Sequence, residues 1–320
     1  MTLLIHPGFH KTATTWLQNE LFTDARWFRM LMQPADVQKW IVGPHDFAFD
    51  PEAARHAISL RRAEGPKAAI DVISNENLVA NPFFGARESK AYVQRLHAIA
   101  PEAKILLTVR RQSAAMRSLY QQYIKRGGSL AEAGFFDLND TCEPGYYGFD
   151  PICLRFDLLA DEYARVFGPD SVLVLPQELL AKNPRAFLEA ILKHCGVPGL
   201  AGDEMPSTNM GAGKSPPDGG TPLLRLANRL RPTPLYPDAP RSLTPLGNFL
   251  YRLAYHQRLF STHYRTKLET VIRDRLPADY ASGNRRLQSY CPVDLTDLKY
   301  PMANSTPQPP TPDNRLESLG

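Results

Sequence analysis

The sequence predicts a three-layer α/β fold, in which helices cover both faces of a central parallel sheet, with a helical C-terminal half. Two observations predict it. Short apolar runs of strand length alternate with helical patterns through the first part of the chain, and only helical patterns follow residue 245. The chain has 320 residues, of which 43% are hydrophobic and 22% are charged, so it can bury a full core.

The elements follow in a regular order along the chain. Strands are expected at 3–6, 68–74, 104–109 and 171–175. Helical patterns begin at Thr14, at about 112–126 and near Pro184, and two more helices are expected at 246–276 and 278–289. A Pro/Gly-rich loop region spans 201–245 and contains a basic helical fragment at 223–231. We expect residues 1–302 to form one domain and the polar, proline-containing segment 303–320 to be a disordered tail.

Charge and cysteine content narrow the possible partners. The net charge of +4 is too small to indicate nucleic-acid binding, although it suits a protein that handles an anionic ligand. The four cysteines form no CxxC pair, so neither zinc nor a disulfide framework is expected. No apolar run is long enough for a signal peptide or a transmembrane segment, which predicts a cytoplasmic location.

The segment from Gly8 to Thr15 lies between the first predicted strand and the first predicted helix. Unpaired backbone N–H groups at a helix N-terminus favour an anion there, and Lys11, Thr14 and Thr15 would add a charge and two hydroxyl donors. The spacing is shorter than that of a Walker nucleotide loop. The alternative interpretation is that Thr14 only caps the helix and Lys11 is a solvated surface charge.

This segment resembles a known family, the sulfotransferases that use 3′-phosphoadenylyl sulfate (PAPS). Their 5′-phosphosulfate loop commonly reads Lys-(Ser/Thr)-Gly-Thr-Thr-Trp-Leu, and this chain reads Lys11-Thr12-Ala13-Thr14-Thr15-Trp16-Leu17. The resemblance implies a P-loop NTPase-like fold. It also implies that Lys11 touches the bridging oxygen and the 5′-phosphate, while the loop through Trp16 holds the rest. Ala13 replaces the usual glycine, which matters only if φ there is positive.

A second motif of this family binds the 3′-phosphate of the nucleotide. It consists of an arginine at a strand end and a serine eight residues later, which here are Arg110 and Ser118. A guanidinium and a hydroxyl are suitable partners for a phosphate. Taken alone, Arg110 and Arg111 would be an exposed pair after a core strand. Related enzymes also close a late basic loop over the 3′-phosphate, which suggests Lys214, although a flexible solvent loop is the alternative.

Sulfuryl transfer requires a cation for the leaving group and a base for the acceptor proton. Lys11 fits the first role, and no metal is required. Glu76, just after the second predicted strand, is the favoured base, because glycan-type members of the family place a glutamate at a comparable point. Capping a helix or pairing with a basic neighbour is the alternative for Glu76. His6 and His10 are competing bases; His6 is expected to orient the loop and His10 to be exposed.

The acceptor is not identified by the sequence. A hydroxyl or amine of a carbohydrate, lipid or small metabolite would fit, and the adjacent residues Phe83 and Phe84 would line its pocket or belong to the core. Two other functions remain open. A P-loop small-molecule kinase would need an acidic magnesium ligand, for which Asp71, inside a strand, is a poor substitute. A non-catalytic nucleotide-binding protein would keep Lys11, Arg110 and Ser118 without turnover.

Overall fold

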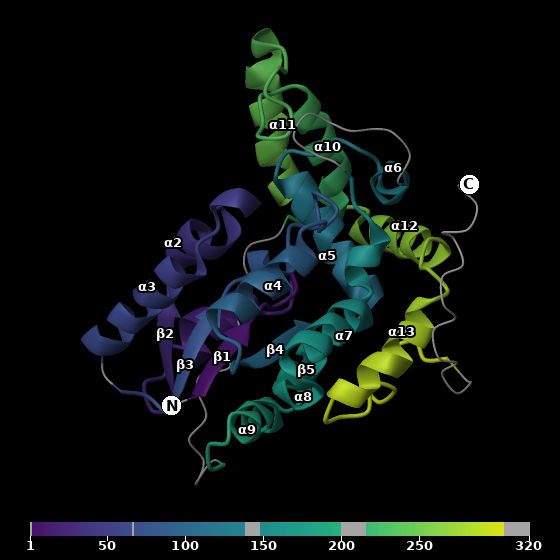
Figure 1. Cartoon of the computed structure of the whole chain (residues 1–320). Helices are drawn as coiled ribbons and strands as arrows, with labels where there is room; N and C mark the ends of the chain where they lie inside the picture. Colours follow the sequence, from purple (N-terminus) through teal and green to yellow (C-terminus); the bar gives the residue numbers. More distant parts are fainter. Residues whose placement is uncertain (1, 66, 138–147, 200–215, 304–320) are drawn as a thin grey trace, which may run out of the picture.

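The computed structural model describes residues 2–65, 67–137, 148–199 and 216–303. It contains a central sheet of five strands in the order β2-β3-β1-β4-β5, and every pair in it is parallel (Figure 1). The strands are β1 (Thr2–His6), β2 (Phe28–Met32), β3 (Ile70–Ser74), β4 (Lys104–Val109) and β5 (Val172–Pro176). Because the sheet is parallel, the carboxyl ends of all five strands lie along one edge.

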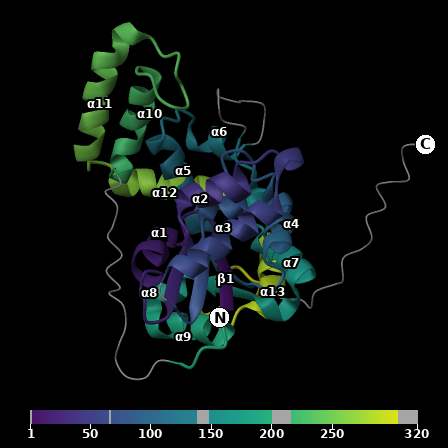
Figure 2. The ribbon, with the colours of Figure 1, turned by 60° about the vertical axis from the view of Figure 1, so that its left-hand side comes forward.

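Helices cover both faces of the sheet, as predicted. In Figure 2, α1 and α8 lie on one side of β1, and α4 and α7 lie on the other. The helices are α1 (Thr14–Trp16), α2 (Pro34–Val37), α3 (Pro51–Glu64), α4 (Ser89–Ile99), α5 (Gln112–Lys125), α6 (Glu132–Phe136), α7 (Phe156–Phe167), α8 (Gln177–Lys182), α9 (Pro184–His194), α10 (Thr221–Arg229), α11 (Thr244–His256), α12 (Ser261–Asp274) and α13 (Tyr280–Leu287).

Burial explains why four of the five strands could be predicted from the sequence. The residues of β3 and β5 are all buried, and β1 and β4 each leave only their first residue partly accessible. Strands covered on both faces become continuous apolar runs. The edge strand β2 was not predicted, because its sequence contains Arg29. This arginine reaches Asp71 of β3 with 2.6 Å between Nη2 and Oδ1, so the charge is neutralised inside the sheet layer.

The C-terminal part is helical, as predicted, but one expected helix is in fact two. Residues 246–276 form α11 and α12, with a break between His256 and Ser261. At this break Phe260 adopts a left-handed φ of 60°. Gly219 packs against the break so closely that a Cβ there would lie 2.2 Å from the Leu259 carbonyl oxygen. The break therefore packs against a segment 42 residues earlier, where the Gly219 amide donates to the Ser261 hydroxyl at 3.1 Å.

Within the described ranges, no helix combines the length and the apolar character that crossing a membrane requires.

Candidate active site

The three central strands bring together the loops that carry the predicted site residues. β1 pairs with β3 on one side and with β4 on the other, and His6 at the end of β1 lies opposite Ser74 at the end of β3. Lys11 follows β1, Glu76 follows β3 and Arg110 follows β4. The sheet order therefore places these three residues after adjacent strands on one edge.

Three hydrogen bonds hold the loop after β1 in place, two of them to β4 and one within the loop. The Phe9 amide donates to the Thr108 carbonyl at 3.2 Å, and the Thr12 hydroxyl donates to the Phe9 carbonyl at 2.5 Å. The hydroxyls of Thr12 and Thr108 also lie 2.8 Å apart. Thr12 is buried, and its side chain holds the loop in shape. Only the backbone of Thr12 is then left to hold the phosphosulfate in the way the resemblance implies.

Two residues of this loop have left-handed backbone conformations. Lys11 has a φ of 69° and Ala13 a φ of 63°. Ala13 is the N-cap of α1, and no side chain caps this helix. Thr14 is the first helical residue, so the interpretation of Thr14 as the cap is wrong. Its Oγ1 is buried and has no hydrogen-bond partner among the described residues, which leaves a hydroxyl for a ligand at the helix start.

The positive φ of Ala13 leads to a stability prediction. A left-handed conformation costs a non-glycine residue about 1–2 kcal/mol, whereas glycine adopts it freely. We expect Ala13→Gly to raise the free energy of unfolding by about 0.5–1 kcal/mol in urea titrations. The control Ala57→Gly, in the middle of α3, should lower it by about 1 kcal/mol. If Ala13→Gly lost stability as the control does, the left-handed conformation of Ala13 would be contradicted.

His6 lies below the loop and connects the three strands. It is fully buried, with 2.8 Å between Nδ1 and the Ser74 hydroxyl and 3.0 Å between Nε2 and the Thr108 hydroxyl. The loop passes so closely that a Cβ on Gly8 would lie 2.6 Å from the His6 ring. With no exposed surface, the ring is not placed to contact an acceptor. Its position matches the loop-orienting role expected from the sequence.

His6 should make stability depend on pH. Burial lowers its pKa from 6.5 to about 3, so between these values the unfolded state binds a proton that the folded state does not. Stability therefore falls as the pH falls through this window. From this residue alone, we expect the free energy of unfolding to be about 1.4 kcal/mol lower at about pH 5.5 than at about pH 8.

The measurement compares urea denaturation at both pH values for the wild type and for His6→Asn. The difference between the two pH values should shrink in the variant, whatever the stability of the variant itself. An unchanged difference would mean that His6 does not titrate as its burial requires.

The cationic residues of the site gather around Lys11. Arg110 Nη1 donates to the Lys11 carbonyl at 3.3 Å, so the side chain of Arg110 reaches the loop that carries Lys11. Partial desolvation, together with the positive charges of Lys125, Arg110 and Arg126, lowers the pKa of Lys11. Desolvation also lowers the pKa of Arg110. Such a concentration of positive charge is suited to a polyanionic ligand.

Lys125 and Arg126 were not among the residues predicted for the site. They lie at the C-terminal end of α5, the helix that starts directly after Arg110 and Arg111. A signal was present in the sequence, because Lys125 follows Ser118 by seven residues and therefore lies on the same face of the helix. Ser118 itself is half-buried on α5, roughly 9 Å along the helix from its start.

The neighbouring arginines Arg110 and Arg111 have different environments. The Arg111 amide donates to Glu178 Oε1 at 3.1 Å, and its Nε lies 3.4 Å from the same oxygen. Tyr300 donates to the other oxygen of Glu178 at 3.0 Å. Arg111 thus ties the end of β4 to α8 and to the C-terminal segment. Arg110 faces the loop instead, so the two are not an equivalent exposed pair.

The remaining predicted nucleotide contacts fall in three places. Thr15 is exposed at the start of α1, and Trp16 is buried with its ring in the core. A contact between Trp16 and a ligand is therefore left to its backbone. Lys214 lies outside the described residues.

Glu76 and His10 lie close enough to each other and to Lys11 to interact electrostatically. Glu76 is half-buried and begins the 3-10 turn η4 (Glu76–Val79), but the side chain that caps this turn is that of Asn75, which accepts from the Asn77 amide at 2.8 Å. His10 is half-buried rather than exposed as predicted, because its Nε2 lies 3.1 Å from the Ala80 carbonyl oxygen. Burial lowers the pKa of His10 to about 4, although the Glu76 charge opposes the shift.

A mostly apolar cavity of about 360 Å³ lies beside this cluster. Arg126 belongs to its wall and at the same time contributes to the lowered pKa values of His10 and Lys11, which connects the cavity to the loop. Phe83 is buried and Phe84 is half-buried and packed against the core. The two phenylalanines also line this cavity, so the pair combines the two locations that the sequence suggested, core and pocket wall. The cavity is lined by Phe83, Phe84, Tyr123, Arg126, Pro234 and Leu235.

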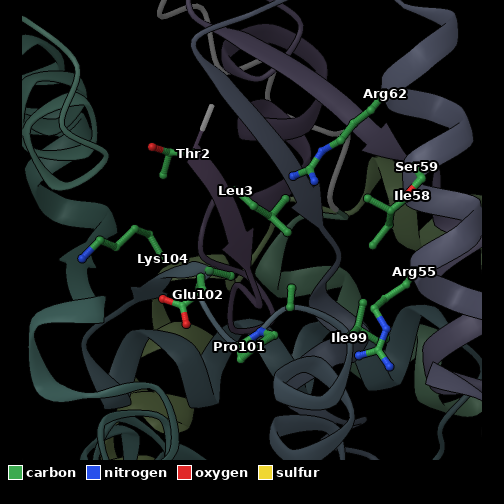
Figure 3. A pocket seen from close by; sticks show the side chains of 12 residues that line it. Thr2, Leu3, Arg55, Ile58, Ser59, Arg62, Ile99, Pro101, Glu102 and Lys104 are labelled. Atoms are coloured by element: carbon green, nitrogen blue, oxygen red, sulfur yellow. The ribbon is translucent and has the colours of Figure 1, made fainter. Parts of the chain in front are cut away.

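A second cavity, of about 480 Å³, lies at the opposite edge of the sheet, where β1 and β4 begin (Figure 3). Three cations border it, but each has a structural partner. Arg62 pairs with Asp71 at 2.8 Å, Lys104 donates to the Asp170 carbonyl at 3.0 Å, and Arg55 pairs with Glu52. Ligands of parallel α/β sheets gather at the carboxyl edge, so we place the candidate site at the loop after β1.

Comparisons with known proteins show the family of the chain. The chain is similar to the crystal structure of a sulfotransferase from Alicyclobacillus acidocaldarius, with 17% identity and a TM-score of 0.47 over 83% of this chain and 99% of that one. No curated protein matches the chain. A profile described as the sulfotransferase family matches residues 3–201, which include the loop after β1 and the ends of β3 and β4. The chain therefore belongs to the sulfotransferase family.

Proposed function

We propose that this protein transfers a sulfuryl group from PAPS to a hydroxyl or amine of an acceptor, with 3′,5′-ADP as the leaving group. The observation that carries the proposal is the contact of Arg110 with the Lys11 carbonyl, because it joins the two segments that carry the predicted phosphate contacts. The Thr14 hydroxyl, which no described residue hydrogen-bonds, and the helix start after Ala13 support it, because both offer donors to an anion.

In this mechanism, the protein binds and orients the donor and moves one proton. The amides after Ala13 and the Thr14 hydroxyl hold the 5′-phosphosulfate, and Arg110 and Ser118 hold the 3′-phosphate. The Lys11 ammonium stabilises the negative charge that develops on the oxygen leaving sulfur. Glu76 accepts the proton of the acceptor hydroxyl as the new oxygen–sulfur bond forms. Positioning of this kind accounts for most of the catalysis in related group transfers.

Asp71 is not arranged as the magnesium ligand that a kinase would need. It lies at the start of β3, fully buried, and both of its oxygens pair with arginines, Arg29 at 2.6 Å and Arg62 at 2.8 Å. Both of its oxygens therefore have partners, and its position near the amino end of β3 lies away from the carboxyl edge after which Lys11 follows. The geometry favours sulfuryl transfer over the kinase alternative.

Isothermal titration calorimetry tests the donor assignment. We expect 3′,5′-ADP to bind without magnesium and more tightly than ATP. Binding of ATP that requires magnesium, with no binding of 3′,5′-ADP, would instead support a kinase. If 3′,5′-ADP binds and no compound is ever sulfated, a non-catalytic binding protein is supported.

We further propose that the apolar part of the acceptor occupies the cavity of about 360 Å³ lined by Phe83, Phe84 and Leu235. Its walls offer mainly apolar contact, and the Arg126 guanidinium, 5.4 Å from the centre of the Phe83 ring, also acts electrostatically on Lys11. Incubating the protein and PAPS with an extract of the host, followed by mass spectrometry, should find the added sulfate on hydrophobic alcohols, phenols or amines. Sulfation confined to free sugars would contradict this part of the proposal.

A further inference from the structure

The pair α10 and α11 stands apart from the layers that flank the sheet (Figures 1 and 2). α10 is anchored to the end of α5, because Asn228 Nδ2 donates to the Ile124 and Gly128 carbonyls at 2.8 Å each. α11 packs on α10 at Gly247, where a Cβ would lie 3.1 Å from the Ala227 carbonyl oxygen. The position of α11 is therefore fixed by its inner face, and its outer face is turned away from the protein.

That outer face carries a row of large apolar side chains. Leu246, Phe249 and Leu253 are spaced three and four residues apart, so they lie on one side of α11. Their exposed fractions are 50%, 63% and 45%, and Leu243 just before the helix is 40% exposed. We call these four residues the α11 stripe. Isolated exposed leucines are common, but a contiguous apolar row on a projecting helix indicates an interaction surface.

The segment that contains the stripe is strongly basic. Residues 221–260 contain six arginines and one acidic residue, Asp238, which gives a formal charge of +5, whereas the whole chain carries +4. The excess positive charge of the protein is thus concentrated on this one projection. Such a separation of charge along a chain is typical of proteins that meet an anionic surface.

The arginines of this segment differ in whether they contact other residues of the protein. Arg225 pairs with Glu132 at 3.3 Å, and Arg231 lies over the Tyr251 ring at 4.1 Å. By contrast, Arg241, Arg252 and Arg258 are exposed, and no ion pair joins them to another described residue. Arg252 follows Phe249 by three residues and therefore lies beside it on the helix surface. The apolar row is therefore bordered by positive charge that is free to meet a partner.

We propose that the α11 stripe and its bordering arginines dock the protein onto an anionic lipid bilayer. An interfacial helix needs an apolar face that enters the region between headgroups and acyl chains, together with cations that meet lipid phosphates. α11 provides both, and its outward position lets it reach a flat surface. Docking of this kind does not require the donor site and is independent of the proposed reaction. It would, however, bring the cavity lined by Pro234 and Leu235, on the α10–α11 connection, close to the membrane.

A second copy of the chain is a less suitable occupant of this surface. A symmetric contact brings the same surface patch of both copies together. The exposed arginines of two such patches, Arg241 and Arg252 among them, would then be gathered in one interface, with only Asp238 of each segment to offset them. Anionic lipid, in contrast, neutralises every arginine at once, with a contribution that corresponds to about fivefold in partitioning for each.

Vesicle flotation with the full chain tests the proposal. Vesicles of phosphatidylcholine with one third phosphatidylglycerol should carry the protein to the top of the gradient, and pure phosphatidylcholine vesicles should carry far less. The double variant Arg241→Gln/Arg252→Gln should bind the anionic vesicles about 25-fold more weakly. Leu246→Ser/Phe249→Ser should abolish flotation, and high salt should weaken the binding of the wild type.

Matched controls alter the same residue types elsewhere. Phe47→Ser removes a fully exposed aromatic side chain from another part of the surface, and Lys182→Gln/Lys193→Gln removes two exposed positive charges. Both should float like the wild type, and all variants should keep their affinity for 3′,5′-ADP and their melting temperature. Two results would overturn the proposal: no flotation of the wild type, or an oligomer in analytical ultracentrifugation that the Leu246→Ser/Phe249→Ser variant dissociates while flotation is unchanged.

Discussion

Replacing Lys11 by alanine is expected to lower the turnover of PAPS-dependent sulfation by about a hundredfold to a thousandfold and the affinity for 3′,5′-ADP by about tenfold. The first effect follows because the ammonium stabilises charge that develops only as the oxygen–sulfur bond breaks. The second follows because a charged donor to a phosphate is lost. Initial rates and calorimetry of the same preparation measure the two effects separately.

The cations around Lys11 determine how the loss should divide between turnover and affinity. Arg110, Lys125 and Arg126 would remain, so part of the electrostatic attraction for the nucleotide persists, and affinity should fall less than turnover. The control Lys193→Ala removes an exposed lysine on α9 and should leave both quantities unchanged. If Lys11→Ala lost affinity alone and kept its turnover at saturating donor, Lys11 would be a binding residue and the catalytic role proposed for it would be wrong.

The positions of the main site residues could be predicted from the sequence for a physical reason. Lys11, Glu76 and Arg110 each follow an apolar run, and buried parallel strands produce such runs directly. Once the strands are recognised, parallel pairing places their carboxyl ends on one edge. The sequence did not reveal the strand order. In the structure β3, β1 and β4 are adjacent, so the three residues follow neighbouring strands.

Features that depend on distant contacts could not be predicted in this way. The edge strand β2 contains Arg29, whose charge is compatible with the sheet only because Asp71 lies beside it. The break between α11 and α12 has no proline or glycine of its own, and it packs against the distant Gly219. The exposure expected for His10 was wrong because the chain after Glu76 folds back, so that the Ala80 carbonyl meets the imidazole. The strand β2, the helix break and the burial of His10 thus depend on contacts with residues distant in the sequence, which local patterns do not reveal.

Replacing Glu76 by glutamine is expected to lower turnover about a hundredfold or more while the affinity for 3′,5′-ADP stays within about twofold. The amide keeps the shape of the side chain but cannot accept the acceptor proton. The fold should tolerate the change, because Asn75 provides the cap of η4 and the Glu76 carboxylate forms no hydrogen bond or ion pair with another described residue. Glu88→Gln, at an exposed glutamate on the same stretch of chain, serves as the matched control.

The pH dependence separates Glu76 from His10, the competing base. Because the Glu76 charge raises the pKa of His10, its removal should move that pKa further below about 4. If His10 were the base, Glu76→Gln would retain high turnover, since the imidazole would stay unprotonated at neutral pH, and His10→Gln would be inactive. If Glu76 is the base, His10→Gln should retain most of its turnover and Glu76→Gln should be slow at every pH. Near-normal turnover of Glu76→Gln would remove Glu76 from the mechanism, since no other change in the variant compensates for a missing proton acceptor.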